Sequence, residues 1–172
     1  MAGFYTEADY ENSVIELFQS MGYRYVYAPD LERDFKSPLY EEELYEALHR
    51  LNPTMPEDAI ADALYKLKNF ENAELVQKNA FFMDYLQHGV EVRYFIKGEE
   101  RSGLIYLVDY SNPGNNSFIV ANQWTFIENS NKRPDVLLFL NGMPVLLVVL
   151  KSPTREETDA SEAYSQIRNY MH

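Results

Sequence analysis

The feature that most restricts the fold is a pair of apolar segments on either side of an Asn-Gly dipeptide. Residues 135–140 and 145–150 consist mainly of leucine and valine, and the loop between them contains Asn141-Gly142. Both residues of an Asn-Gly pair tolerate positive φ, so the pair favours a tight antiparallel hairpin. Because residues 145–150 are apolar at every position, we expect this strand in the middle of a sheet, covered on both faces.

The hairpin has a consequence for two polar residues at its open end. Asp135 begins the first segment after Arg133-Pro134, and Lys151 directly follows the second segment. An antiparallel hairpin places the start of one strand beside the end of the other. We therefore expect the side chains of Asp135 and Lys151 to meet at the same edge of the sheet.

Hydrophobic periodicity divides the rest of the chain into helical and extended parts. Residues 30–89 have apolar positions at helical spacing and are predicted to form a helical insertion. Residues 90–172 are predicted to contain the main sheet and a following helix. The expected elements are a helix beginning near Thr6, a strand over 23–27, helices over 40–51, from Pro56 and over 71–87, strands over 90–96, 104–110 and 118–127, and a helix from about residue 154.

The first predicted helix has a recognisable start and an apolar face. The hydroxyl of Thr6 is suited to cap the helix, and the carboxylate of Asp9 suits its first turn. Gly22 is placed to end the helix. The apolar residues at helical spacing are Val14, Leu17, Phe18 and Met21.

Composition restricts the function. The 172 residues suffice for one domain or one domain with an insertion, and 46% of them are hydrophobic. A net charge of −12 argues against strong independent binding to nucleic acid, because lysine and arginine supply most non-specific affinity for phosphates. The absence of cysteine excludes disulfides and thiolate metal sites. With neither a long apolar run nor a signal-peptide pattern, the expected location is the cytoplasm and no membrane partner is expected.

The Pro134-Asp135 pair, the hairpin and Lys151 together resemble the PD-(D/E)xK nuclease motif. The resemblance extends to the N-terminal endonuclease domain of the restriction (R, motor) subunit of type I restriction enzymes. It covers essentially the whole chain. The residues that carry it are the segment from Asn131 to Pro144, Lys151-Ser152-Pro153, the Q-x-x-x-Y pattern of Gln166 and Tyr170, Tyr10-Glu11, and the segment from Asn122 to Phe126.

This resemblance implies a restriction-endonuclease-like αβββα core with a helical insertion, in the α/β class. It implies magnesium-dependent cleavage of double-stranded DNA by a type I site-specific deoxyribonuclease subunit. Methyltransferase and specificity subunits would be the partners. The full subunit would also contain an ATP-driven translocase, but this chain has no Gly-x-x-x-x-Gly-Lys-Ser/Thr pattern and therefore no ATP site of its own.

The resemblance also assigns roles to individual residues. Asp135 would bind the metal, with Glu11 as an additional candidate ligand, and Lys151 would stabilise the charge of the transition state. Gln166 and Tyr170 share one helix face and would orient the DNA or the catalytic strand. The motif places a second carboxylate two residues before the lysine, where this sequence has Val149.

Valine cannot ligate a metal, so two functions remain open. In the first, the chain is a nuclease domain whose activity is impaired. Valine also removes the electrostatic cost of a second carboxylate beside Asp135, which favours the stability of the strand. In the alternative, the chain is a non-catalytic interaction domain that docks other domains or subunits through its helices and acidic surface.

Overall fold

The computed structural model describes residues 6–70, 74–127 and 131–151, together with residues 161, 164, 165, 167 and 168. The chain forms two compact units, each described by itself below. The first unit consists of Met1–Pro38, Phe118–Phe139 and Pro144–His172, and the second of Leu39–Ser117 and Leu140–Met143. None of the described helices is long and apolar enough to cross a membrane.

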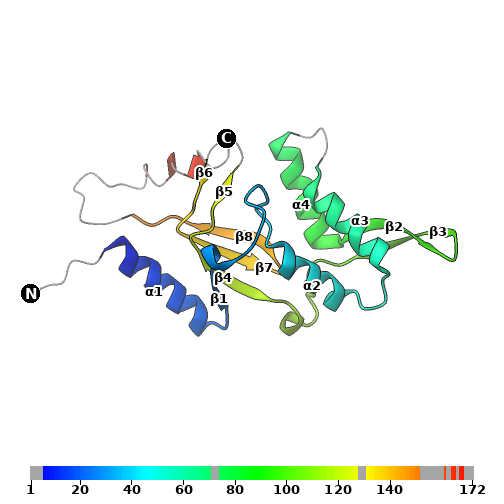
Figure 1. Ribbon diagram of the computed structural model, residues 1–172, viewed down its shortest axis with the longest axis horizontal. Helices are drawn as coiled ribbons and strands as arrows, with labels where there is room; N and C mark the ends of the chain where they lie inside the picture. The colour runs from blue at the N-terminus through cyan, green and yellow to red at the C-terminus, as the bar shows by residue number, and fades with distance from the viewer. Residues whose placement is uncertain are drawn as a thin grey trace, which may run out of the picture. The chain divides into compact units, whose positions relative to one another are not determined.

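A four-stranded sheet forms the centre of the first unit (Figure 1). Its first two strands are parallel, with Tyr27 opposite Asn122. The spatial order is β1-β4-β7-β8, so β7 lies between β4 and β8. The strands are β1 (Arg24–Tyr27), β4 (Phe118–Asn122), β7 (Val136–Leu140) and β8 (Met143–Val148).

The hairpin predicted from the Asn-Gly pair is present. Only Asn141 and Gly142 separate β7 from β8, so these neighbouring strands run antiparallel. Asn141 has φ +50° and Gly142 has φ +78°, the left-handed conformations that a two-residue hairpin turn of this kind requires. The turn therefore fixes the pairing of β7 with β8.

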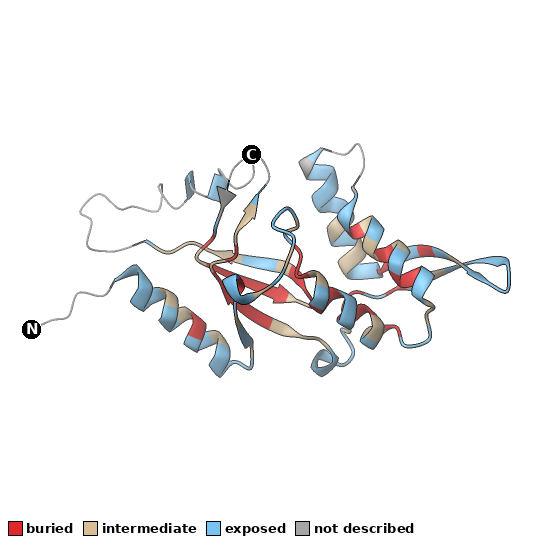
Figure 2. Cartoon of the chain, in the orientation of Figure 1, coloured by how far each residue is buried: buried red, intermediate tan, exposed pale blue. Residues whose placement is uncertain are grey.

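The prediction of a central position for residues 145–150 is wrong. Among the described strands β8 is at the edge of its sheet, and Val145 and Leu146 are each 48% exposed. β7 is the buried strand, with Val136 and Phe139 fully inaccessible, whereas Figure 2 shows exposed residues on β8. An apolar run indicates that a surface needs covering, but it does not identify which neighbour covers it.

Helix α1 (Glu7–Ser20) packs on this sheet (Figure 1). Its predicted start is confirmed: the Thr6 side chain accepts from the Asp9 backbone N–H, and the Asp9 carboxylate accepts from the Thr6 backbone N–H. The predicted apolar face is only partly right, because Leu17 and Met21 are 57% and 64% exposed. The helix is rotated so that the sheet-facing stripe is centred on Ile15, with Val14 and Phe18 beside it, against Val120, Val136 and Leu138.

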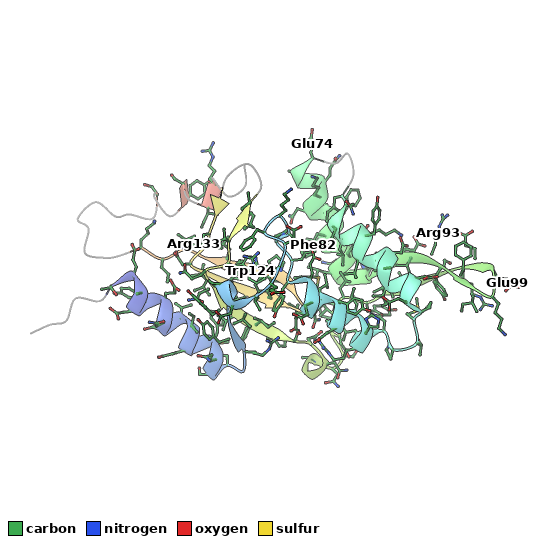
Figure 3. The ribbon with its side chains drawn as sticks, in the orientation of Figure 1. Glu74, Phe82, Arg93, Glu99, Trp124 and Arg133 are labelled. Atoms are coloured by element: carbon green, nitrogen blue, oxygen red, sulfur yellow. The ribbon has the colours of Figure 1, made fainter. Side chains whose placement is uncertain are left out.

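The second unit combines three helices with a two-stranded sheet. Its core includes Leu44, Leu48 and Ile60, which lie within the predicted helical residues 30–89 and are fully buried. Strands β2 and β3 pair only with each other, and Figure 3 shows Arg93 and Glu99 on this hairpin. The elements are α2 (Glu41–Leu51), α3 (Glu57–Lys68), α4 (Leu75–His88), β2 (Val90–Ile96) and β3 (Glu99–Ile105).

The compact units divide the chain at other positions than the predicted boundary between residues 89 and 90. Val90 and Val92 of β2 are buried in the core formed with α2 and α3. Residues 90–117 therefore belong with the helices and not with the four-stranded sheet. The alternation of a strand shows which face is buried, but it does not show which layer covers that face.

Two predicted strands also differ in extent. The strand expected over 104–110 begins earlier, as β3 over 99–105. Lys97 and Gly98 both have positive φ and form a tight turn directly after β2, so the next strand starts at Glu99. The strand expected over 118–127 is interrupted at Gln123, which has φ +56°. The remaining short elements are β5 (Phe126–Ile127), paired with β6 (Asn131–Lys132), and 3-10 turns at Ala28–Asp30 and Pro113–Asn115.

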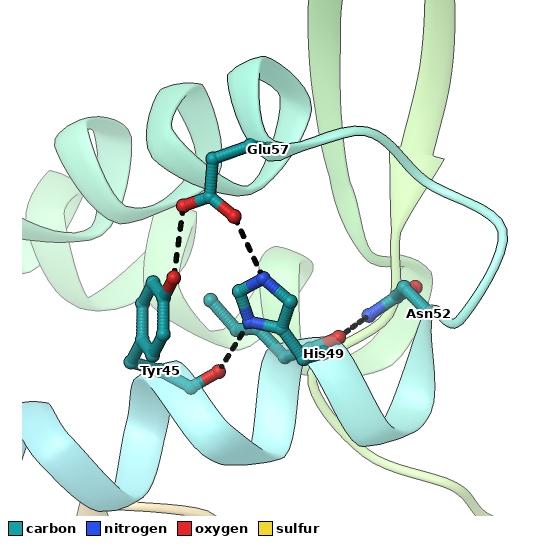
Figure 4. Close-up of polar contacts among 5 residues, drawn as sticks. Tyr45, His49, Asn52 and Glu57 are labelled. Atoms are coloured by element: carbon teal, nitrogen blue, oxygen red, sulfur yellow. Dashed lines mark hydrogen bonds and ion pairs between the residues drawn. The ribbon is translucent and has the colours of Figure 1, made fainter.

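A polar cluster joins α2 to α3 in the second unit (Figure 4). The Glu57 carboxylate accepts from the Tyr45 hydroxyl at 3.1 Å and contacts Nε2 of His49 at 2.8 Å. Nδ1 of His49 lies 3.0 Å from the Tyr45 carbonyl oxygen. Both neighbours of the imidazole are acceptors, so the doubly protonated ring satisfies both and the pKa of His49 is raised, first by the Tyr45 carbonyl and then by Glu57.

Candidate functional site

Asp135 lies at the open end of the β7–β8 hairpin, directly before β7. Its Oδ2 accepts a hydrogen bond of 2.6 Å from the backbone N–H of Leu150, the residue before Lys151. The structure therefore brings Asp135 and the residues after β8 together at one end of the sheet, as the hairpin argument predicted. Lys151 itself is exposed.

The charges around Asp135 act in opposite directions. Burial raises the pKa of the Asp135 carboxyl, and the negative charges of Glu11 and Glu7 raise it further. The hydrogen bond from Leu150 and the positive charge of Lys151 lower it. Asp135 thus lies in a partly buried acidic environment that a cation would neutralise.

Val149 occupies the position of the missing motif carboxylate. It is half-buried and lies between the end of β8 and Leu150. Its side chain offers no ligand and no proton acceptor. The carboxylates interacting with Asp135 therefore come from α1, which contributes Glu11 and Glu7.

Glu11 is held by the last residue of β4 and by the residue that follows this strand. Its Oε1 accepts from Nδ2 of Asn122 at 2.6 Å and from Nε2 of Gln123 at 3.4 Å. Oδ1 of Asn122 accepts from the hydroxyl of Tyr25 at 2.9 Å. Burial raises the pKa of Tyr25, and the nearby Glu11 raises it further, so the hydroxyl keeps the proton that it donates. These contacts form a chain from β1 through β4 to α1.

Sequence reasoning did not identify this chain of contacts. Asn122 and Gln123 were included only within a segment that resembles the family, and Tyr25 was assigned only to a strand. One signal was present: Asn122 is polar and ends the run Phe118–Asn122, where it is only 8% exposed. A buried asparagine needs partners, and these are visible only once β1 and α1 are placed beside β4.

The carboxylates of Asp135 and Glu11 are ligands of the kind that magnesium prefers, but these two groups alone do not complete its coordination. Magnesium is usually bound in proteins by one or two carboxylates together with water, and Asp135 and Glu11 supply two hard oxygen groups. One oxygen of each is engaged, by Leu150 and by the Asn122 and Gln123 amides respectively. Within the described parts of the chain, no group of three or more His, Cys, Asp or Glu side chains is placed to hold a metal ion.

Two predicted site residues cannot be placed. Gln166 and Tyr170 lie outside the described residues. Their neighbours Tyr164, Ser165, Ile167 and Arg168 are helical. The proposed roles of Gln166 and Tyr170 stay predictions.

The mixed α/β fold, with Asp135 before one hairpin strand and Lys151 after the other, fits the class of nuclease-like α/β domains. Comparison with known families is more specific. Residues 4–172 match the family described as the Type I restriction enzyme R protein N terminus. The chain belongs to this family, which confirms the resemblance found in its sequence.

Individual relatives agree with the family match. The chain is 33% identical to the Type I restriction enzyme HindI endonuclease subunit of Haemophilus influenzae, over 95% of this chain and 16% of that protein. It is 27% identical to the Putative type I restriction enzyme MjaIXP endonuclease subunit of Methanocaldococcus jannaschii, over 94% of this chain and 16% of that protein. The chain therefore spans about one sixth of the length of these relatives.

Proposed function

We propose that this chain is the nuclease domain of a type I restriction subunit, whose cleavage of double-stranded DNA depends on magnesium. The observation that supports this most directly is the hydrogen bond from the Leu150 backbone to Asp135, which fixes the carboxylate beside the residue preceding Lys151. The family match gives this arrangement its nuclease-related context. In the full subunit, cleavage would be coupled to ATP-driven translocation, with methyltransferase and specificity subunits as cytoplasmic partners.

Each residue has a definite part in this proposal. A bound magnesium ion would polarise the scissile phosphate and lower the pKa of an attacking water. Asp135 would bind the ion, and Glu11 would be an additional ligand of the same ion. Lys151 is exposed and positively charged, so it would approach the phosphate and stabilise its developing charge. The net charge of −12 means that other domains would hold the DNA.

Val149 is expected to make this copy a weak nuclease. Loss of one carboxylate should lower magnesium affinity and reduce cleavage by orders of magnitude. We therefore expect Val149→Glu to bind magnesium or manganese more tightly than the natural chain. Isothermal titration calorimetry on the two proteins measures this difference directly.

The matched control is Leu146→Glu, which adds the same charge to an exposed position of β8. Asp135→Ala in the Val149→Glu chain should abolish the gain in affinity. Equal metal binding by the natural chain, Val149→Glu and Leu146→Glu would contradict the proposed nuclease site.

One observation favours the alternative, a non-catalytic interaction domain. Val145 and Leu146 are exposed on β8, and a shallow, mainly apolar hollow of about 270 Å³ lies there. Its lining includes Phe126, Leu137 and Leu147. Such a surface is typical of contacts with other domains. No gain of metal binding in Val149→Glu would favour this alternative.

A further inference from the structure

We infer that Asn122 is a positioning residue of the candidate nuclease site, because its amide holds the Glu11 carboxylate in place beside Asp135. This inference rests on the proposed function and goes further by assigning a role to a residue that acts through Glu11. In Figure 1, α1 lies beside the strands β1 and β4. The contact from Asn122 to Glu11 comes from the end of β4, and Tyr25 of β1 contacts Asn122.

The Asn122 amide has a partner on each side, and the Glu11 carboxylate determines its orientation. The Tyr25 hydroxyl donates to Oδ1 at 2.9 Å, and the Glu11 carboxylate accepts from Nδ2 at 2.6 Å. The carboxylate can only accept, so a flipped amide would place its oxygen against Glu11 and lose that contact, whereas the Tyr25 hydroxyl can accept from the amide nitrogen as well as donate to the amide oxygen. Because Asn122 is only 8% exposed, water cannot readily replace these partners.

Gln123 adds a second amide to the same oxygen of Glu11. Its backbone has φ +56°, an unusual conformation for glutamine, and its Nε2 lies 3.4 Å from Oε1. Two amides on Oε1 leave Oε2 with no hydrogen bond among the described residues. Asp135 also has one oxygen of this kind: its Oδ2 accepts from Leu150, and no described residue donates to its Oδ1.

This arrangement differs from a tether that serves stability alone. Glu11 and Asp135 are both carboxylates, and they lie close enough for their charges to interact. Like charges at short range favour separation unless something holds them. Asn122 and Gln123 supply that restraint, and Lys151 compensates only part of the charge. A cation held between the free oxygens of the two acids would remove the repulsion.

The absence of a carboxylate at position 149 makes Glu11 more important here. Outer residues that orient metal ligands typically contribute 10- to 100-fold to affinity. If Asn122 acts through Glu11, its removal should matter only while Glu11 carries a carboxylate. We therefore predict that the effects of Asn122 and Glu11 on metal affinity are coupled, and not simply that removing Asn122 weakens binding.

The experiment is a double-mutant cycle in the Val149→Glu chain, read by calorimetric binding of manganese and not by activity. Asn122→Ala should weaken binding about 10- to 100-fold. In a chain that already carries Glu11→Gln, the same change should alter affinity by less than about twofold. The matched control is Asn52→Ala, which removes a buried asparagine with bonds to Leu48 and Tyr106 in the second unit and should leave affinity unchanged.

Three results would count against the inference or its basis. An equal loss in both Glu11 backgrounds would show that Asn122 acts only on the fold, and no loss in either would remove its role. If Val149→Glu binds no manganese at all, the proposed function fails first. If circular dichroism shows that Asn122→Ala does not fold, Tyr25→Phe replaces it. We expect Tyr25→Phe to weaken manganese binding about threefold, and only in chains that carry Glu11. An equal loss of affinity in both Glu11 backgrounds, or no loss in either, overturns the inference.

Discussion

Two buried asparagines, one in each compact unit, have different surroundings. Asn141, at the turn after β7, is fully buried and bonds only to neutral groups and Arg50. Its Nδ2 donates to Leu107 and Asn116 at 2.8 Å, and its Oδ1 accepts from the Ser117 N–H at 2.8 Å. Asn122, at the end of β4, instead donates to the charged carboxylate of Glu11.

The difference separates a structural network from a candidate functional one. Around Asn141, donors and acceptors are matched, and such a network fixes one conformation. Around Asn122, the network ends at Glu11, whose charge acts on Asp135. Each of these two acids has one oxygen without a hydrogen bond in the described structure. Local destabilisation of this kind is typical of binding sites.

The largest effect is expected at Gly142, in the turn with the structural network. A Cβ there would overlap the Leu44 backbone and the Tyr40 carbonyl oxygen, and φ is +78°. We expect Gly142→Ala to lower the free energy of unfolding by roughly 3–5 kcal/mol, the sum of backbone strain and overlap. Urea denaturation measures the change. Gly98→Ala is the control, because it has φ +84° with no atom near its Cβ and should cost about 1–2 kcal/mol. Equal losses would show that close packing at the turn is unimportant.

Asn141→Ala should have the next largest effect. It leaves buried partners of Asn141 without hydrogen bonds, which should lower stability by about 2–3 kcal/mol. Gln123→Ala is the matched control, because Gln123 is also an amide residue with positive φ but makes one hydrogen bond of 3.4 Å. Its loss should be below about 1 kcal/mol. If Gln123→Ala costs as much as Asn141→Ala in thermal denaturation, the contrast between the networks is wrong.

Asp135→Asn should raise the free energy of unfolding, whereas the substitutions above lower it. Burial and Glu11 raise the pKa of Asp135 in the folded state, so its charged form destabilises the fold above that pKa. This cost disappears as pH falls below the unfolded value of 3.8. The variant should therefore be more stable than the natural chain at neutral pH, by on the order of 1 kcal/mol, and lose this advantage near pH 3. A loss of stability at neutral pH would contradict the unfavourable environment assigned to Asp135.

The smallest effect concerns His49 in the second unit. Its folded pKa is raised by the Tyr45 carbonyl and Glu57, so its contribution is fully present below the unfolded value of 6.5 and is lost as pH rises through the folded pKa. His49→Gln should therefore lower Tm more near pH 5.5 than near pH 8.5, by less than about 4 °C because the pair is exposed. Glu57→Gln should weaken this pH dependence. A larger effect at the higher pH would reverse the assignment.

Local sequence signals predicted the helices α1 to α4 and the hairpin. Thr6 and Asp9 form the expected cap, and Asn141-Gly142 forms the expected turn. From that turn the sequence predicted that Asp135 and Lys151 would meet at the same edge of the sheet, and the hydrogen bond from Leu150 places Asp135 beside the residue that precedes Lys151. These features depend on interactions over a few residues or across one tight turn, so local chemistry suffices to predict them.

Only the tertiary structure showed which element packs against each apolar strand face. The apolar run at 145–150 did not show that β8 lies at a sheet edge, nor did the alternation at 90–96 show that β2 packs with helices. The contacts of Tyr25, Asn122 and Glu11 link segments up to 111 residues apart. The sequence by itself determined the family and the Asp135–Lys151 hairpin. Only the three-dimensional packing determined which distant groups surround Asp135, because a side chain's periodicity specifies its face and not its neighbour.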